Sequence, residues 1–259
     1  MTFFYRKHLR LALTLAGLAT LYLIASLGLG FQQATLLQAH NGIAWMLQHF
    51  IPDAAAFTNL GSIGYQLWRT FVIATAATGL AGLVSLILAL LGARNIVTHS
   101  ATLSWLIRGF ASLMRNIPVI AWALLLLFSF KQNELTGYLA LFLMNLGFLT
   151  RAFMETIEDF NPDKLEALRA TGATYPQALA QSLLPEISVP ISEWLLYSVE
   201  NNLRDATLVG LLTGTGVGFL FDLYFKSLNY PAAGLVVLTL VILVIALEMV
   251  ANLIRKVIA

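Results

Sequence analysis

The stretch EALRATGATYPQALAQSLLPE, residues 166–186, is polar and rich in alanine, and it interrupts a chain that is otherwise strongly apolar. Hydrophobic residues make up 59% of the 259 residues and charged residues only 11%, and the mean hydropathy is +0.80. Soluble domains carry roughly 25% charged residues. A chain this apolar needs lipid around much of its surface. The stretch therefore predicts one large polar loop in a polytopic membrane protein.

Six apolar runs approach the roughly 20 residues that a bilayer core requires. Backbone groups in lipid must be satisfied internally, and these runs are too long for barrel strands, so each predicts a helix. The first run has no small-residue cleavage site after it and is expected to be retained. The expected spans are 9–30, 68–92, 103–130, 135–153, 187–213 and 231–253. Together they predict an all-α polytopic membrane protein with about six transmembrane helices in a single domain, 1–259.

Basic residues are distributed unevenly between the loops, and this asymmetry predicts the orientation. With the N-terminus in the cytoplasm, the external side carries only Lys131, Lys226 and, at a span edge, Arg69. The cytoplasmic side then carries Arg6, Lys7, Arg10, Arg94, Arg151, Lys164, Arg169, Arg255 and Lys256. The positive-inside rule therefore predicts that both termini and the loop 155–186 are cytoplasmic.

The segment 31–67 is expected outside the membrane, at its surface, because Gln, His, Asn and Pro are frequent in it. Its apolar residues recur at helical spacing and oppose polar ones. The apolar set is Leu36, Ile43, Leu47 and Phe50, and the polar set is Gln33, His40, Asn41 and Gln48. This pattern predicts an amphipathic helix at the outer interface, with a structural role favoured over a functional one.

The polar loop itself predicts two short helices. Asn161 and Pro162 are typical of a helix start, and a helix over 162–171 is expected. Gly172 can end it in a left-handed conformation, and Thr174 can cap a second helix. About thirty residues is far more than a simple connection needs, which favours a docking element over an inert loop.

These residues resemble the EAA loop of binding-protein-dependent ABC importer permeases: Glu166-Ala167, then Gly172 six positions after the glutamate, then Leu184-Pro185. In that family the loop is a coupling helix that inserts into a groove of the ATPase subunit. The resemblance implies a type I ABC importer permease fold with a cytoplasmic coupling helix–turn–helix. It assigns ATPase-coupling roles to Glu166, Ala167, Arg169, Gly172, Leu184 and Pro185. Leu168 and Ser182 depart from the usual pattern and leave the docking contacts open.

Two further strings, RATGA (169–173) and ENNLRDATLVG (200–210), resemble the phosphonate/phosphite branch of these permeases, although Thr213 and Thr215 stand where the branch prefers glycine. This resemblance implies a permease subunit, in the bacterial inner membrane, of an importer for phosphonate, phosphite or a related phosphorus oxyanion. The implied partners are a second permease copy or close homologue, two ATPase subunits and an external solute-binding protein. ATP and Mg²⁺ would bind to the ATPase, with no cofactor in this chain.

Charged and amide side chains within the third and fifth runs mark a candidate translocation path. A charge at the bilayer centre costs about 2.5–3.5 kcal/mol or more, so it normally faces a bundle interior or a water-filled path. The candidates are Arg115, Asn116, Glu200, Asn202 and Arg204. Glu200 and Arg204 are spaced i,i+4 and could neutralise one another. A structural ion pair without substrate contact therefore stays open as the alternative.

Other functions find less support. A permease for another solute, such as methionine or an organic anion, is the nearest alternative. An intramembrane enzyme using Glu193, Glu200 and Asp205, or a simple channel, would leave the loop unexplained. The sequence has no Walker A motif, so ATP would be hydrolysed by another subunit; G-x-G-x-G at 214–218 instead predicts close packing or an irregular turn. The chain has no Cys, and its net charge of +2 does not suggest nucleic acid.

Overall fold

The computed structural model describes residues 2–31, 38–96 and 101–258, and it divides into two compact units, Met1–His49 and Phe50–Ala259. All regular elements among the described residues are helical. The first unit holds α1 (Thr2–Gly28) and α3 (Ala39–His49). No residue of α3 is buried. The expected amphipathic helix is thus present over its second half, while Gln33 and Leu36 lie outside the described residues.

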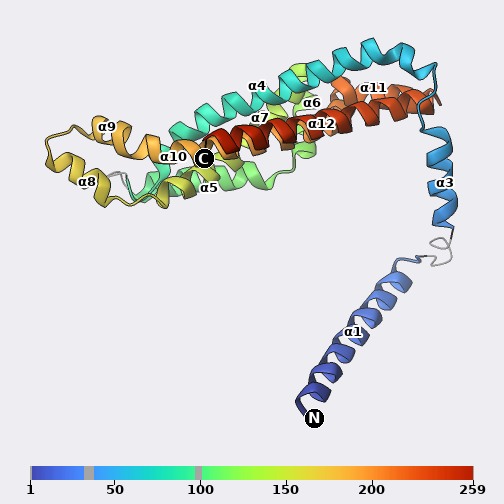
Figure 1. Ribbon diagram of the computed structural model, residues 1–259, viewed down its shortest axis with the longest axis horizontal. Helices are drawn as coiled ribbons and strands as arrows, with labels where there is room; N and C mark the ends of the chain where they lie inside the picture. The colour runs from blue at the N-terminus through green and yellow to red at the C-terminus, as the bar shows by residue number, and fades with distance from the viewer. Residues whose placement is uncertain (1, 32–37, 97–100, 259) are drawn as a thin grey trace. The chain divides into compact units, whose positions relative to one another are not determined.

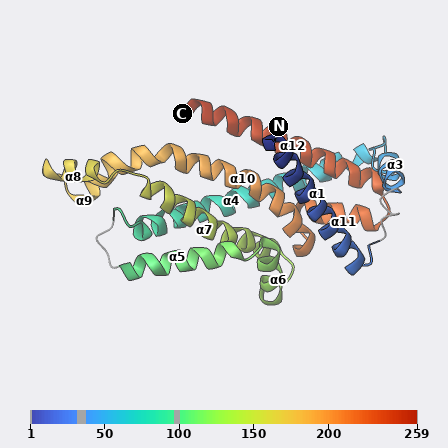
Figure 2. The ribbon, with the colours of Figure 1, turned by 90° about the horizontal axis from the view of Figure 1, so that it is seen from below.

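The second unit is an elongated bundle (Figure 1). Its long helices are α4 (Leu60–Gly92), α5 (Ala101–Asn116), α6 (Val119–Phe130), α7 (Glu134–Glu158), α10 (Leu184–Thr213), α11 (Gly216–Lys226) and α12 (Tyr230–Ile258). The short ones are η1 (Ala56–Asn59), α8 (Asp163–Ala170), α9 (Tyr175–Ala178) and η2 (Leu179–Leu183). In both ribbon views α8 and α9 form one end of this bundle and α11 lies towards the other (Figures 1 and 2).

Four helices of the described chain are long and apolar enough to cross a membrane, or six if two bent helix pairs each count as one span. The expected number of about six therefore requires both bent pairs. The expectation of a continuous third span, 103–130, is wrong. The chain bends by 90° between α5 and α6, at Pro118, whose backbone is extended with ψ 145°. Proline has no N–H to donate and disfavours helical geometry in the residue before it.

The second span begins earlier than expected, whereas the fifth ends at Thr213 as expected. α4 begins at Leu60, so the end of the expected interfacial segment 31–67 is part of a long helix. Phe50, expected on that segment's apolar face, instead stacks on Tyr230 with ring centroids 5.6 Å apart. α10 ends where Gly214 turns left-handed at φ +68°, and α11 follows at a 55° bend. The G-x-G-x-G string thus forms an irregular turn, as expected.

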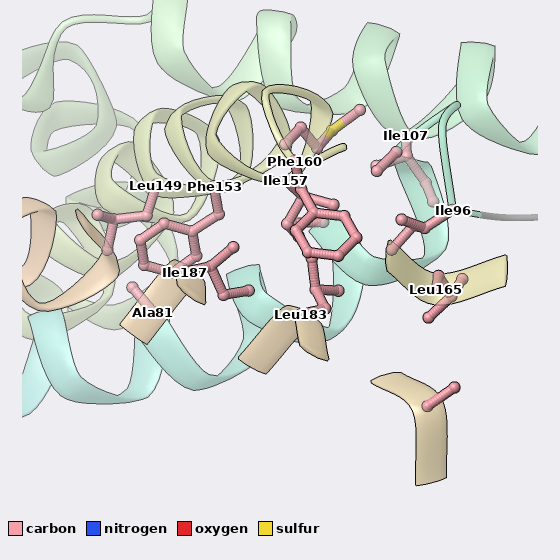
Figure 3. Close-up of a cluster of buried hydrophobic side chains, with 14 residues drawn as sticks. Ala81, Ile96, Ile107, Leu149, Phe153, Ile157, Phe160, Leu165, Leu183 and Ile187 are labelled. Carbon is pink, nitrogen blue, oxygen red and sulfur yellow. The ribbon is translucent and has the colours of Figure 1, made fainter. Parts of the chain in front are cut away.

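A hydrophobic cluster at the α8–α9 end joins the loop helices to the bundle. Phe153 of α7 is fully buried at its centre, together with Leu149 and Ile157 one turn to either side. Leu165 from α8 and Leu183 from η2 belong to the same cluster. Figure 3 shows side chains of this cluster from α4 (Ala81), α7 (Phe153), α8 (Leu165), η2 (Leu183) and α10 (Ile187). The polar loop is therefore packed onto the membrane helices rather than loosely attached to them.

This core predicts a large effect of a single truncation. Replacing a fully buried phenylalanine by alanine costs about 3–5 kcal/mol, so Phe153→Ala should lower the melting temperature of the purified protein in detergent by roughly 10 °C. Phe128→Ala is the matched control, because Phe128 is 90% exposed and should melt like the unchanged protein. Equal melting temperatures for the two variants would contradict the packing described above.

Candidate functional site

The helical hairpin formed by α8, α9 and η2 is the first part of the candidate site. α8 starts one residue later than expected, and the Asn161 side chain accepts a hydrogen bond from the Asp163 N–H at 2.9 Å. At the start of α9, the Gln177 side chain accepts from the Thr174 N–H at 2.9 Å and from its hydroxyl at 2.8 Å. Pro176 follows in the first turn, where a missing N–H costs nothing. The sequence therefore specifies both helix starts locally.

Gly172 makes the turn between the two helices. Its φ is +95°, a region that L side chains rarely adopt, and a Cβ built on it would meet nothing within 4 Å. The requirement for glycine is thus purely conformational, since there is room for a side chain. This outcome confirms the left-handed helix end that the sequence predicts.

The hairpin has a buried face and an exposed face. Leu165, Ala178 and Leu183 are buried in the cluster around Phe153, and the Lys164 ammonium pairs with the Glu186 carboxylate of α10 at 2.6 Å. The predicted coupling residues lie on the other side. Exposed to solvent are Glu166, Ala167, Arg169, Gly172, Leu184 and Pro185. The arrangement leaves a firmly held surface free to contact a partner.

A set of hydrogen bonds ties this hairpin to the segment after α4. The Tyr175 hydroxyl donates to the Ile96 carbonyl. The neighbouring Asn95 amide donates to the carbonyls of Ile157 at 2.7 Å and Phe160 at 2.9 Å, which lie at the end of α7. Glu158 accepts from the Arg94 N–H at 2.9 Å and pairs with Arg108 of α5. The segment after α4 thus meets three helices, α5, α7 and α9, at this clasp, defined here as Asn95, Ile96, Glu158 and Tyr175.

The second part of the candidate site is a pocket of about 290 Å³ between α7 and α10. Both aromatic and polar side chains line it. From α7 these are Met144, Asn145 and Phe148, and from α10 they are Tyr197, Ser198, Asn201, Arg204 and Asp205. Cationic, amide and hydroxyl donors are the groups that bind oxyanions. The pocket can therefore hold a small polar anion between these two helices.

Arg204 is held in place at the wall of this pocket. Its guanidinium pairs with the Glu200 carboxylate one turn earlier and donates to the side-chain amide oxygen of Asn201 at 3.2 Å. The Arg204 side chain remains 51% exposed, whereas that of Glu200 is 16% exposed. Glu200 therefore orients the guanidinium and leaves other N–H groups of Arg204 available.

Residues 81–259 match the family described as binding-protein-dependent transport system inner membrane component. The match covers well over half of the chain. The chain belongs to this family. It is thus an inner-membrane transport component.

Several curated permeases are similar to this family member. It is 28% identical over 91% of its length to the phosphate-import permease protein PhnE of Mycolicibacterium smegmatis, but spans only 44% of that protein. It is 27% identical over 74% of its length to the phosphite transport system permease protein PtxC of Stutzerimonas stutzeri, of which it spans 72%. A phosphonate permease protein of Escherichia coli, PhnE2, described as putative and cryptic, is 27% identical over 46% of the chain.

Solved ABC transporters share the fold of this permease family member. The chain superposes on the MetNI methionine transporter with a TM-score of 0.68 and 17% identity, covering 80% of this chain and 99% of that one. An alginate transporter gives a TM-score of 0.61 at 15% identity, over 95% of this chain. The fold is therefore the type I ABC importer permease fold.

The structure separates the five predicted path residues. Only Arg204 lines the pocket, with Glu200 paired to it. Asn202 is fully buried and donates to the Thr78 hydroxyl of α4 at 2.6 Å, so it joins two helices instead. Asn116 donates to the Ser112 carbonyl in its own helix at 2.7 Å. The Arg115 side chain is exposed and makes no hydrogen bond or ion pair with the described residues.

Sequence reasoning missed most of the pocket. Ser198, Asn201 and Asp205 were not singled out as a group, although they are spaced i, i+3 and i+7 and so share one helical face. That spacing was the available signal on α10. Asn145, one polar side chain on the neighbouring helix α7, gave no comparable signal, because only the packing of α7 against α10 brings it to this face.

Tyr175 predicts a pH-dependent contribution from the clasp. Burial raises the pKa of its hydroxyl above the usual 10.0, opposed by the nearby Arg169 charge. The protonated hydroxyl is the donor to Ile96, so its stabilisation is fully present below about pH 10 and is lost as pH rises through the raised pKa. The wild-type melting temperature should therefore exceed that of Tyr175→Phe at pH 8, and the difference should vanish well above pH 10. A difference that stays constant with pH would contradict this role.

Proposed function

We propose that this chain is the membrane-spanning permease subunit of an ATP-driven importer for phosphonate, phosphite or a related phosphorus oxyanion. The observation that carries the substrate class is the Arg204 guanidinium at the wall of a polar pocket between α7 and α10. Arginine matches the geometry of phosphorus oxyanions through paired N–H donors. The relatives named for phosphate, phosphite and phosphonate transport support the same class.

The proposed partners are two ATPase subunits, an external solute-binding protein, and a second permease that is either the same chain or a close homologue. The exposed face of the hairpin, with Glu166, Ala167 and Arg169, docks into the ATPase. ATP and Mg²⁺ bind there and not to this chain. When ATP closes the ATPase dimer, the hairpins move inward and the membrane helices reopen on the other side.

In this proposal the hairpin end of the second unit is cytoplasmic. The helix ends and connections at that end hold Arg94, Arg151, Lys164, Arg169 and Arg255, whereas Arg69, Lys131 and Lys226 lie in or next to the opposite ends of helices. This distribution agrees with the positive-inside rule. The N-terminus is assigned to the cytoplasm from its own basic residues.

The coupling role of the hairpin predicts that Gly172→Val abolishes substrate-stimulated ATP hydrolysis in the reconstituted complex. A β-branched residue is strained at φ +95° even where space is free, so the turn must change. Gly109→Val is the control, because a Cβ there also meets nothing within 4 Å and no unusual φ is present. Both variants should insert into the membrane. Normal stimulation in Gly172→Val would rule out this docking assignment.

The orientation predicts opposite labelling of two introduced cysteines in a chain that has none. Gln38→Cys should react with an impermeant maleimide in cells with a permeabilised outer membrane. Gln181→Cys, on the exposed part of η2, should react only after the inner membrane is opened. Reaction of Gln181→Cys with the impermeant maleimide while the inner membrane is intact would contradict this orientation.

The substrate role of Arg204 predicts a complex that assembles but does not transport. The double variant Glu200→Gln/Arg204→Gln removes both charges together, so neither member of the pair is left as an unpaired charge. It should co-purify with the ATPase yet lose uptake of radiolabelled methylphosphonate in proteoliposomes supplied with the binding protein, because no cation replaces the anion's lost hydration.

Asp222→Asn/Lys226→Gln is the matched control for this experiment. Those residues form another i,i+4 ion pair, at 2.6 Å in α11, outside the pocket. The control should assemble and transport normally. Full uptake by the Glu200→Gln/Arg204→Gln variant would show that the Glu200–Arg204 ion pair has only a structural role. Absence of uptake of every phosphorus oxyanion by the unchanged complex would overturn the proposed substrate class.

A further inference from the structure

Two polar groups that line the pocket between α7 and α10 make no hydrogen bond or ion pair within the described part of the chain. Ser198 is 2% exposed, and its hydroxyl makes no hydrogen bond there. Helical serines usually donate to a carbonyl one turn earlier, as Ser192 does to Ser188 at 2.7 Å. A buried polar group without a partner costs about 1–3 kcal/mol. The Ser198 hydroxyl is thus available to a ligand in the pocket that it lines.

Asp205 is the second of these groups. Its half-buried carboxylate lines the same pocket, and no hydrogen bond or ion pair joins it to residues 2–31, 38–96 or 101–258. The adjacent Arg204 is already paired with Glu200. An ionised carboxylate only accepts hydrogen bonds. The pocket therefore combines donors for an anion with one acceptor that repels an anion's bare oxygens.

These two groups together select the protonation state of the ligand. Sulfate near neutral pH offers only acceptor oxygens, and Asp205 would repel it. A singly protonated phosphorus oxyanion offers acceptor oxygens and one P–OH donor. We propose that Asp205 makes this pocket selective for an oxyanion with a P–OH group, accepting its hydrogen while Ser198 and Arg204 donate to the unprotonated oxygens. This inference rests on the proposed function and deepens it.

Two probes of equal charge isolate the P–OH group. Methylphosphonate, at a pH where it is a monoanion, carries one P–OH, and its monomethyl ester is a monoanion without one. Binding of each to the permease–ATPase complex in nanodiscs, without the binding protein, is measured by broadening of the ³¹P NMR line. The unchanged complex should bind methylphosphonate at least about tenfold more tightly than the ester, because the ester leaves the carboxylate unpaired.

Three variants assign this preference to residues. Asp205→Asn should bring the ratio of the two affinities close to one, because an amide can donate to the ester oxygens. Ser198→Ala should weaken both probes by about tenfold and leave the ratio unchanged. Asp222→Asn, a carboxylate outside the pocket, should change neither affinity. Co-purification with the ATPase establishes that each variant has assembled.

Equal binding of the two probes by the unchanged complex would overturn the proposal, and this comparison needs no variant. So would a preference that survives in Asp205→Asn, or unchanged affinities in Ser198→Ala, as expected if only water meets that hydroxyl. Uptake with the binding protein is read separately from the same preparation. If methylphosphonate is imported but shows no preference over the ester, this inference fails while the proposed function stands. If the unchanged complex imports no methylphosphonate, the proposed function fails instead.

Discussion

The packing of the hairpin against Phe153 is the interaction on which the rest of the structure depends. A polar loop at the end of a membrane bundle has no lipid to hold it, and its own short helices would be unstable alone. Leu165 and Leu183 hold the loop in place because they pack into the same core as residues of α7 and α4. The clasp around Tyr175 and Asn95 adds hydrogen bonds at the same end. The exposed face of α8 is therefore held against the membrane helices by both apolar packing and hydrogen bonds.

The polar side chains of α10 are of two kinds: some join helices to one another, and others line the pocket. Asn202 is fully buried and joins α10 to α4 through Thr78, so it is part of the framework. Ser198, four residues before Asn202, and Asp205, three residues after it, lie on a neighbouring part of the same helical face, line a pocket and keep unused hydrogen-bonding capacity. A single helix thus carries a structural polar contact and a candidate anion site next to one another. Since α10 begins directly after the hairpin, the two parts of the candidate site are connected by one continuous helix.

Much of this arrangement could be predicted from the sequence, because it follows from local chemistry. The apolar runs required helices, and Gly172 and Thr174 marked the turn and the second helix start. The bend at Pro118 was also locally encoded, but the apolar composition of 103–130 obscured it. The pocket was harder to predict, because Asn145 reaches it only through the packing of α7 on α10. Asn202 and Arg204 look equivalent in a sequence, and only tertiary structure shows that one is buried and the other exposed.

Spin labels can test whether the hairpin and the bundle move as one body. The labels are attached at two exposed positions, Ala180→Cys on η2 and Leu91→Cys on α4. The absence of native cysteine makes the labelling specific. Pulsed electron resonance on an assembled complex in which only one of the two permeases is labelled would measure the distance between the two labels without nucleotide and with ATP bound. If the hairpin is rigidly attached, the distance distribution is narrow and unchanged between the two states. A distribution that shifts or broadens on ATP binding would contradict it.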